Sequence, residues 1–281
     1  MITFEKALAE FGKKLFRKGF SIGTIKWYIE QTKRVFNGCW KIENWQSITA
    51  NEIENWIYSN KKLSNWTKNA YSVQIRAFLR FCRSLDLKTV NPEQIAVQKY
   101  HVREAKYLSE NEEKKVLSYL NKKWINQNMK ACILLMLSTG LRVSEACNLS
   151  KKKFRNAYFI EWMYQIPIQW KWGTIRPIFI PPKIYKHLEK FSNRHSERTI
   201  IPVKNNQIQK LIKKFSKKIE INFTAHTFRH TYCTKLAQKG VEIHKIQKLA
   251  GHTCIITTSR YLHTSNIELA KVSGLIADIS Y

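Results

Sequence analysis

Five short segments in the second half of the chain hold residue types that suit chemistry at a phosphate group. Each offers a basic, imidazole or phenol side chain at a turn or near a helix end: Arg142 in Thr139–Glu145, Lys171 and Arg176 around a turn, His226 with Arg229, His252 after Gly251, and Tyr261 before His263. Singly, each segment is weak evidence, because an arginine at a helix start is usually solvated and a tyrosine in a helix is usually packed. Together they indicate phosphoryl transfer, which needs cationic donors around the phosphate.

The spacing of two histidines raises a metal-binding alternative. His226 and His230 lie four residues apart, as zinc ligands on one helix face do. The segment lacks the glutamate of a His-Glu-x-x-His motif, and it places Arg229 between the histidines, where its charge would oppose a metal cation. The i, i+3 spacing of His226 and Arg229 instead puts an imidazole and a guanidinium on one face. We therefore expect no metal site.

The elements that position these segments fall into two predicted domains, and residues 1–92 are predicted to form the first from four helices. A capping box at Thr49 and Glu52 starts one helix, and a long helix follows Ser64. The apolar face of this long helix is predicted to comprise Trp66, Ala70, Val73, Ala77, Phe81 and Leu85. It also carries basic side chains, namely Lys68, Arg76, Arg80 and Arg83. A linker is predicted over residues 93–106.

The second domain is predicted over residues 107–281. It begins with a capping box at Ser109 and Glu112, and an apolar helix then ends at the turn before Gly140. Residues 157–180 are strand-like, with a hairpin turn at 171–173, and their prolines, Pro167 and Pro177, are expected on sheet edges. Further helices are predicted over 182–191, 206–219, 227–239, 241–250, 255–262 and, as a tail, about 266–281. The tail has an apolar face formed by Ile267, Leu269, Val272, Leu275 and Ile276.

The composition points to a polyanionic partner. The 281 residues include 49 Lys and Arg against 20 Asp and Glu, a net charge of +29, and a hydrophobic content of 44% excludes a disordered polycation. DNA or RNA is favoured over a membrane surface, because no helix concentrates basic residues opposite a Trp and Leu face. Neither a membrane-spanning stretch nor a secretory signal is visible, so we expect a soluble, cytoplasmic protein.

In this order, the five segments resemble the tyrosine recombinase (phage integrase) family. The Gly-Leu-Arg-Val-Ser-Glu string at 140–145, the His-x-x-Arg pair and the Gly-His to Tyr-x-His spacing carry a resemblance that covers nearly the whole chain. The family pattern implies six catalytic residues and one that orients the site, in the order Arg142, Lys171, His226, Arg229, His252 and Tyr261, with Glu145. At the hairpin the family usually reads Gly-Lys-Gly-x-Lys-x-Arg, whereas this chain reads Trp-Lys-Trp-Gly-Thr-Ile-Arg, and aligning on Arg176 selects Lys171.

The residue types fit the implied roles. Arg142 and Arg229 can each bind phosphate oxygens through a planar guanidinium that stays charged. Tyr261 attacks the phosphorus, His226 accepts its proton, and the second histidine adds a hydrogen-bond donor. Lys171 protonates the 5′-oxygen that leaves. Because the arginines supply the charge that Mg²⁺ supplies elsewhere and the phosphotyrosine keeps the energy of the broken bond, neither a metal nor ATP is implied.

The resemblance implies a mainly α (α+β) fold, with a four-helix SAM-like DNA-binding domain and a mostly helical catalytic domain that contains a small antiparallel β-sheet. It implies a site-specific DNA recombinase that acts through a 3′-phosphotyrosine intermediate and a Holliday junction, in chromosome-dimer resolution or in mobile-element integration and excision. The layout is closest to the short Xer-type members. Contacts to DNA are expected from Lys68, Arg76, Arg80, Arg83 and Arg176.

The implied partners are a double-stranded recombination site and copies of this chain, which form a tetramer on two sites through exchanged C-terminal tails. A second recombinase or an accessory factor is left open. A type IB topoisomerase or a telomere-resolving enzyme shares the chemistry, but the compact N-terminal layout argues against both. A DNA-binding regulator with an inactive catalytic fold is the alternative of another class, and the filled catalytic positions argue against it.

Overall fold

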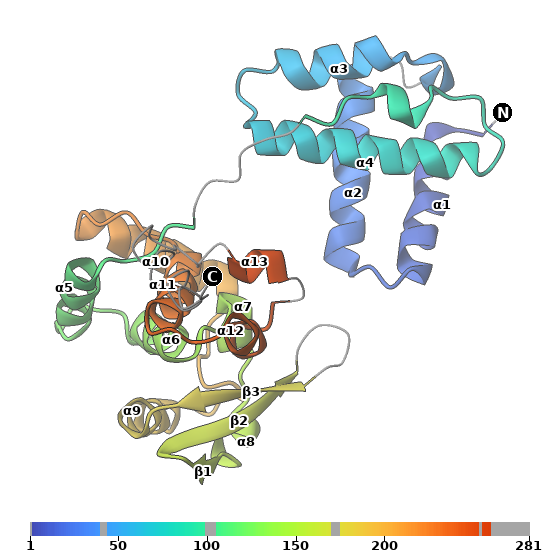
Figure 1. Ribbon diagram of the computed structural model, residues 1–281. Coiled ribbons are helices and arrows are strands. Elements are labelled where there is room, and N and C mark those ends of the chain that lie inside the picture. Colours follow the sequence, from blue (N-terminus) through green and yellow to red (C-terminus); the bar gives the residue numbers. More distant parts are fainter. Residues whose placement is uncertain (1, 40–43, 99–104, 170–174, 253–254, 260–281) are drawn as a thin grey trace, which may run out of the picture. The chain divides into compact units, whose positions relative to one another are not determined.

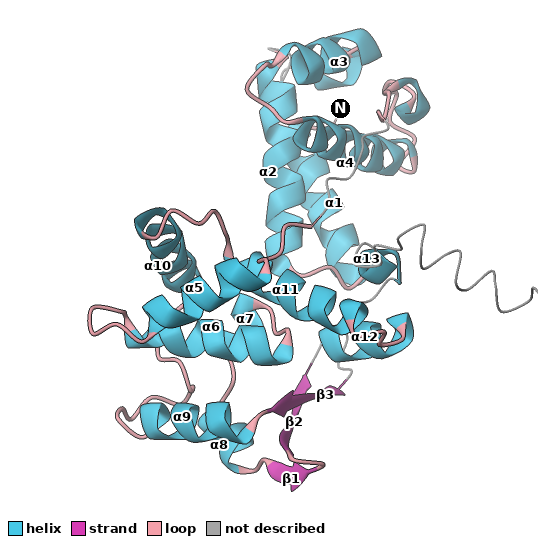
Figure 2. Ribbon diagram, turned by 60° about the vertical axis from the view of Figure 1, so that its left-hand side comes forward, coloured by secondary structure: helices cyan, strands magenta, loops and turns pink. Residues whose placement is uncertain are grey.

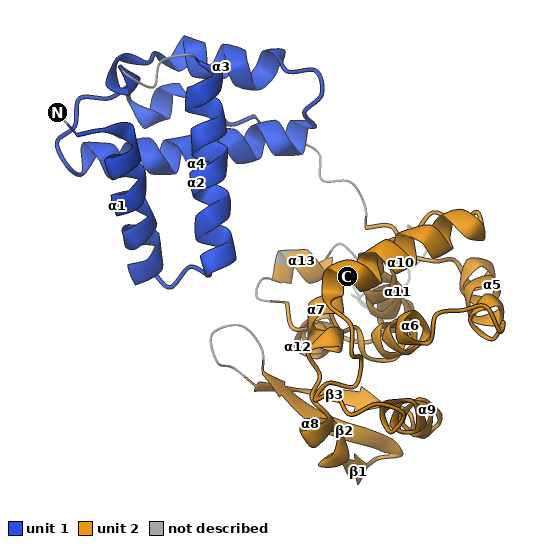
Figure 3. Ribbon diagram, turned by 180° about the vertical axis from the view of Figure 1, so that it is seen from behind, with its two compact units in different colours: residues 1–102 blue, residues 103–281 orange. Residues whose placement is uncertain are grey.

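The chain folds into two compact units, residues 1–102 and 103–281, which are described separately below (Figure 3). The structure is a computed structural model, and it describes residues 2–39, 44–98, 105–169, 175–252 and 255–259. In these residues no helix is long and apolar enough to cross a membrane.

Unit 1 is built from helices that surround an aromatic core. Its α-helices, within the described residues, are α1 (Phe4–Arg17), α2 (Ile22–Gly38), α3 (Ala50–Ser59) and α4 (Asn65–Arg83), with short 3-10 turns η1 (Trp45–Ser47) and η2 (Pro92–Gln94). Helices α1 and α2 lie side by side and α4 crosses them (Figure 1). Phe36 joins them, because its ring centroid lies 4.8 Å from that of Phe4 and 5.7 Å from that of Phe78. The capping box predicted at Thr49 and Glu52 is present.

The buried face of α4 differs from the predicted one. Trp66, Val73 and Leu85 were expected in the core, but they are 56%, 45% and 43% exposed. The core is formed instead by a row at i, i+4, i+7, i+8 and i+11: Tyr71, Ile75, Phe78, Leu79 and Cys82. Apolar residues occur on both sides of this helix, and the aromatic residues of α1 and α2 determine which side is covered. The predicted apolar face was therefore wrong at Trp66, Val73 and Leu85, whereas Phe81 is buried as expected.

Unit 2 is organised around α6 (Gln127–Thr139), a helix that is apolar on nearly every side and therefore buried. Helices α7 (Val143–Cys147), α9 (Pro182–Ser192), α10 (Asn205–Lys218), α11 (Ala225–Gln238) and one strand all contact it. The remaining helices are α5 (Glu110–Leu120), α8 (Lys151–Arg155), α12 (Ile243–Ala250) and α13 (Ile255–Ser259). Figure 2 shows this mainly helical arrangement, with the strands gathered at one side of the unit.

The strands of unit 2 form one small antiparallel sheet, so the predicted fold class is confirmed. Their order is β1 (Tyr158–Ile160), β2 (Met163–Gln169) and β3 (Ile175–Ile180). Pro177 lies on an edge strand as expected, whereas Pro167, opposite it, lies on the middle strand. The middle strand tolerates Pro167 because β1 pairs only with residues 163–165, so the proline has a neighbouring strand on one side alone. The predicted turn at 171–173 lies outside the described residues.

Candidate active site

The first arginine of the site is placed by the sharp junction between α6 and α7. Gly140 ends α6 with φ +66°, and a Cβ there would lie 2.4 Å from the ring of Tyr232, so only glycine fits. Arg142 then occupies the N-cap of α7. Its backbone N–H donates to Oε2 of Glu145 at 2.8 Å, and its Nη1 donates to Oε1 at 3.0 Å. Glu145 thus caps the helix and orients the guanidinium at once.

The second arginine lies inside the unit. Arg229, on α11, is 3% exposed, and its Nη1 donates to the carbonyl oxygen of Gly140 at 2.7 Å. Its Nη2 is buried and has no hydrogen-bond partner among the described residues. Burial, followed by the nearby charge of Arg142, lowers the pKa of Arg229 to about 10. A buried cation with an unused donor beside a second cation is a site that an anion would stabilise.

Arg176 occupies a different position from the predicted one. We expected it to contact DNA, but it is 3% exposed on β3. Its Nη2 donates to Oε2 of Glu145 at 2.9 Å, and its Nη1 contacts the carbonyl oxygen of Leu249. A buried guanidinium that is already bonded to a carboxylate and to the end of α12 cannot reach a DNA surface. We therefore assign Arg176 to holding the site together.

The end of α12 completes this cluster. Gly251 ends the helix with φ +69°, and a Cβ there would lie 2.5 Å from Nε of Arg176. The carbonyl oxygen of Gly251 accepts from Nη2 of Arg142 at 3.1 Å. Two helix-ending glycines, one before α7 and one after α12, therefore each present a carbonyl to a candidate catalytic arginine. Arg142 and Arg176 share the carboxylate of Glu145, and Arg229 is bonded to a carbonyl oxygen, so this cluster of three guanidiniums keeps excess positive charge.

Both candidate histidines are placed beside these arginines. Neighbouring protein atoms, followed by the charges of Arg229 and Arg142, lower the pKa of His226, although its ring still reaches solvent. His252 is 5% exposed, and burial, followed by the same two arginines, lowers its pKa to about 3. Its Nδ1 lies 2.8 Å from Oγ1 of Thr258. Both imidazoles are therefore neutral at pH 7, so each can supply either a donor or an acceptor.

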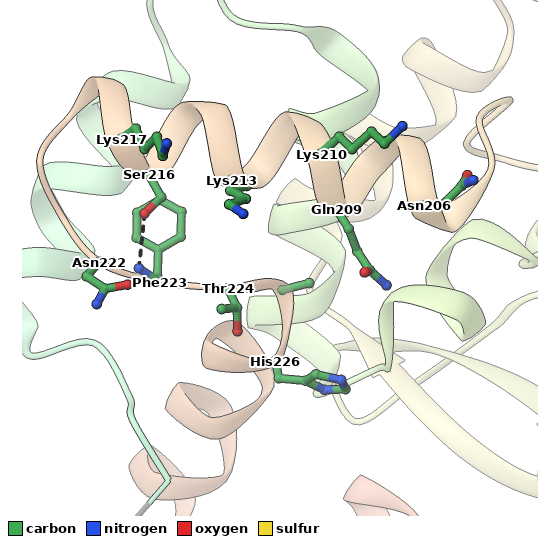
Figure 4. Close-up of a pocket in the computed structure, with 11 residues that line it drawn as sticks. Asn206, Gln209, Lys210, Lys213, Ser216, Lys217, Asn222, Phe223, Thr224 and His226 are labelled. Carbon is green, nitrogen blue, oxygen red and sulfur yellow. Dashed lines mark hydrogen bonds between the residues drawn. The ribbon is translucent and has the colours of Figure 1, made fainter. Parts of the chain in front are cut away.

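A groove beside His226 is lined by lysines that sequence reasoning did not single out. It has a volume of about 580 Å³ and runs between α10 and the segment that leads into α11. Figure 4 shows Lys210, Lys213 and Lys217 along α10, with Thr224 and His226 across from them. The three lysines are exposed, and their i, i+3, i+7 spacing, which places them on one helix face, is visible in the sequence.

The candidate DNA-binding residues of unit 1 lie on α4, and Lys68, Arg76 and Arg80 have partners within this unit. Arg76 and Arg80 both pair with Glu93, which is half exposed, and Nη2 of Arg80 lies 2.6 Å from its carboxylate. Nζ of Lys68 donates to the carbonyl oxygen of Tyr58 at 3.0 Å. Arg83 is exposed at the end of the helix.

Two of the predicted catalytic residues, Lys171 and Tyr261, lie outside the described residues, as does the predicted tail over 266–281. The described residues therefore bring together Arg142, His226, Arg229 and His252 with Glu145. Across the described part of the chain no group of three or more His, Cys, Asp and Glu residues could hold a metal ion.

The chain is similar to known proteins over most of its length. The sequence model of the phage integrase family matches residues 106–267. Tyrosine recombinase XerA of Pyrococcus horikoshii is 28% identical over 275 residues, which cover 94% of this chain and 91% of that protein. Tyrosine recombinase XerC of Rickettsia canadensis is 28% identical over 237 residues, 78% of this chain and 77% of that protein.

Solved structures share the fold. The Tn1549 transposon integrase in complex with a circular intermediate DNA superposes with a TM-score of 0.71 at 19% identity, covering 98% of this chain and 99% of that one. A lambda integrase dimer bound to a COC′ core site gives a TM-score of 0.73 at 18% identity, covering 94% and 97%. At these identities the likeness concerns the fold alone.

Proposed function

This chain belongs to the phage integrase family, and we propose that Arg142 and Arg229 bind the scissile phosphate of its DNA substrate. The protein is a tyrosine recombinase, which cleaves and rejoins DNA strands in site-specific recombination. The observation that carries the proposal is the buried Nη2 of Arg229, which has no hydrogen-bond partner among the described residues, while Nη1 of the same guanidinium is held by a backbone carbonyl that does not neutralise it. Such preorganised donors stabilise the charge that grows on the phosphate oxygens in the transition state.

The strand-cleavage step follows from the residue types. Oη of Tyr261 forms a bond to phosphorus, the bond from phosphorus to the 5′-oxygen breaks, and a 3′-phosphotyrosine results. The phenol proton passes to His226, whose lowered pKa keeps it neutral and able to accept. His252 donates a hydrogen bond to the reacting phosphate. The 5′-oxygen takes a proton from Lys171, and the reverse reaction with the 5′-hydroxyl of another strand completes the exchange through a Holliday junction.

The role of Lys171 can be tested by chemistry that is specific to a general acid. The DNA site is first selected from a randomised duplex library with the full chain. Lys171→Ala should then cleave normal DNA slowly, by a factor of about 10² to 10⁴, and should recover on DNA whose bridging 5′-oxygen is replaced by sulfur, because a thiolate leaves without a proton. Slow cleavage of both substrates would move the general-acid role to another residue.

The DNA is proposed to lie against both units. Unit 1 would be the core DNA-binding domain and unit 2 the catalytic domain, with a linker shorter than the predicted 93–106, because η2 and the buried Ile95 belong to unit 1. Lys210, Lys213 and Lys217 support a phosphate-binding face on α10 that leads to His226, because their charges are exposed and aligned. The basic face of α4 supports the same role for unit 1. A protein that acts on DNA in this way would work in the cytoplasm at the nucleoid.

Assembly is proposed to be a tetramer on two DNA sites, with a second recombinase or an accessory factor as further partners for direction and control. The apolar positions of the sequence over 266–281 support docking of this tail on a neighbouring copy, since a short amphipathic helix is not stable alone. A chain lacking residues 266–281 should bind one site and fail to recombine two. Tetrameric synapses of the shortened chain, measured by light scattering, would exclude tail exchange. Chromosome-dimer resolution and mobile-element integration are both consistent with this function.

A further inference from the structure

The ring and the backbone of His252 are held by two different helices. Its backbone N–H donates to the carbonyl oxygen of Gln247 at 3.1 Å, and Nε2 of Gln247 donates back to the carbonyl oxygen of His252 at 3.1 Å, which ties the backbone to α12. Nδ1 of the ring lies 2.8 Å from Oγ1 of Thr258 on α13. Thr258 is fully buried and His252 is 5% exposed, so water does not compete for this hydrogen bond.

The direction of that hydrogen bond decides what the histidine can do. A neutral imidazole carries one N–H and one lone pair, and the partner of one nitrogen sets the state of the other. Burial, followed by the charges of Arg229 and Arg142, lowers the pKa of His252 and disfavours a protonated ring, so His252 is neutral and its tautomer matters. If the hydroxyl of Thr258 donates to Nδ1, Nε2 must carry the proton and can donate to an anionic oxygen. If the hydroxyl accepts, Nε2 can only accept.

We propose that Thr258 is a positioning residue that donates its hydroxyl proton to Nδ1 of His252 and thereby holds the histidine as the Nε2–H tautomer. This inference rests on the proposed role of His252 as a donor to the reacting phosphate. If the Thr258 hydroxyl donated elsewhere, the tautomer of His252 would not be determined by it. A hydroxyl that donates to Nδ1 places the ring proton on Nε2.

The same hydrogen bond links two parts of the site. Gly251, the residue before His252, accepts from Nη2 of Arg142 at 3.1 Å, so one short segment contacts both the arginine cluster and α13. Thr258 precedes Tyr261 by three residues in the sequence. A hydroxyl at this position therefore ties the arginine cluster to the segment from which the proposed nucleophile follows.

Three substitutions test the proposal. Thr258→Val keeps the side-chain shape and removes the hydroxyl, Thr258→Ser keeps the hydroxyl, and Thr257→Val makes the same change at the half-buried neighbour on α13. Thr258→Val should slow single-turnover cleavage of the selected site by about 10-fold or more and leave DNA affinity unchanged. Thr258→Ser should cleave within a few-fold of wild type, and Thr257→Val should match wild type. Thermal unfolding checks that each variant is folded.

The tautomer is read independently of activity. In the DNA-free wild type, the ¹⁵N resonances of the His252 imidazole should show a protonated Nε2 and a hydrogen-bonded Nδ1, and Thr258→Val should change this pattern while Thr257→Val should not. An Nδ1–H tautomer in wild type, or equal cleavage by wild type and Thr258→Val, would overturn the inference. So would a serine variant as slow as the valine one. Failure of the proposed function is distinguishable, because the wild type would then form no covalent adduct with DNA.

Discussion

Arginines serve the two units in opposite ways. On α4 of unit 1, Arg76 and Arg80 pair with Glu93, and their side chains are 19% and 59% exposed, so Arg80 is the exposed member of the pair. In unit 2, Arg176 and Arg229 are each 3% exposed. Exposed ion pairs exchange readily with water, salt or another anion and contribute about 0–1 kcal/mol. The buried guanidiniums are desolvated and fixed, so their positions are set before any substrate arrives.

The acceptors differ as well. In unit 1 the acceptor shared by Arg76 and Arg80 is one carboxylate, that of Glu93. In unit 2 the carbonyl oxygen of Gly140 orients Arg229 without cancelling its charge, and Arg142 donates to the carbonyl oxygen of Gly251 as well as to Glu145. An uncharged acceptor therefore holds a cation in place and leaves it available to an anion. In the proposed roles, the phosphate-binding surface on α4 and the catalytic phosphate site of unit 2 use the same residue type. They differ in how deeply the arginines are buried and in the kind of acceptor that holds them.

The largest effect should separate the two sets directly. Arg229→Lys replaces a planar fork by a point charge in a buried site, so cleavage should fall by about 10² to 10³-fold. Arg80→Lys, the matched change on the exposed helix, should stay within a few-fold of wild type. Single-turnover cleavage of the selected site measures both. If the two variants lose activity equally, burial is not what distinguishes the sets.

The shared carboxylates provide the second test. Glu145→Gln leaves Arg142 and Arg176 without their common counter-charge, and breaking a largely buried pair costs about 3 kcal/mol of unfolding free energy. Glu93→Gln breaks the pairs of a half-exposed carboxylate with Arg76 and Arg80 and should cost about 1 kcal/mol or less. Urea unfolding compares the two variants. An equal loss of stability in both variants would mean that Glu145 does not hold the arginine cluster together.

The positive charges of Arg229 and Arg142 should also affect how the cleavage rate depends on pH. Partial burial, followed by the charges of Arg229 and Arg142, lowers the pKa of His226 below 6.5. The neutral base therefore persists to lower pH. Protonation removes the base, so the cleavage rate should fall on the acid side only below pH 6.5. The rate is measured from pH 5 to 8 under single-turnover conditions. If the rate instead falls with a midpoint above pH 6.5, either the pKa of His226 is not lowered or His226 is not the base.

The smallest effect is expected at the exposed set. If Arg80 releases Glu93 and contacts one phosphate, Arg80→Ala should weaken binding to all sequences alike and reduce the salt dependence of log K by about 0.9. The cleavage rate of bound DNA should not change. Binding measured across a series of salt concentrations gives the slope. A slope equal to that of wild type would place Arg80 away from DNA.

Local features of this fold could be predicted from the sequence. The capping box at Ser109 and Glu112, and the helix that carries His226 and Arg229, follow from spacings of three residues, which the backbone of a helix dictates. The small sheet followed from β-branched residues on both sides of a turn signal. Such patterns need no knowledge of the rest of the chain.

Long-range relations could not be predicted. Nη1 of Arg229 is bonded to a carbonyl oxygen 89 residues earlier, and any backbone carbonyl is an equivalent acceptor in the sequence. In the sequence, Arg176 looks like an ordinary basic residue of a strand. Only the fold shows that it is buried and bonded to Glu145 and to the end of α12. The lysines of α10 are periodic in the sequence, but only the fold brings them beside His226. An arginine on the surface differs from one in the candidate site in its burial and in its hydrogen-bond partners. Both depend on how the chain packs, so the sequence alone does not show them.

If the arginine cluster presents a phosphate to Tyr261, covalent trapping should capture the phosphotyrosine. A nicked suicide form of the selected site lets the free 5′ fragment diffuse away, so any phosphotyrosine accumulates. Wild type should form a covalent adduct through a 3′-phosphate on Tyr261, located by peptide mapping. Tyr261→Phe, which removes only the attacking oxygen, should bind the DNA with unchanged affinity and form no adduct. A covalent adduct that persists in Tyr261→Phe, or that maps to another residue in wild type, would contradict the account.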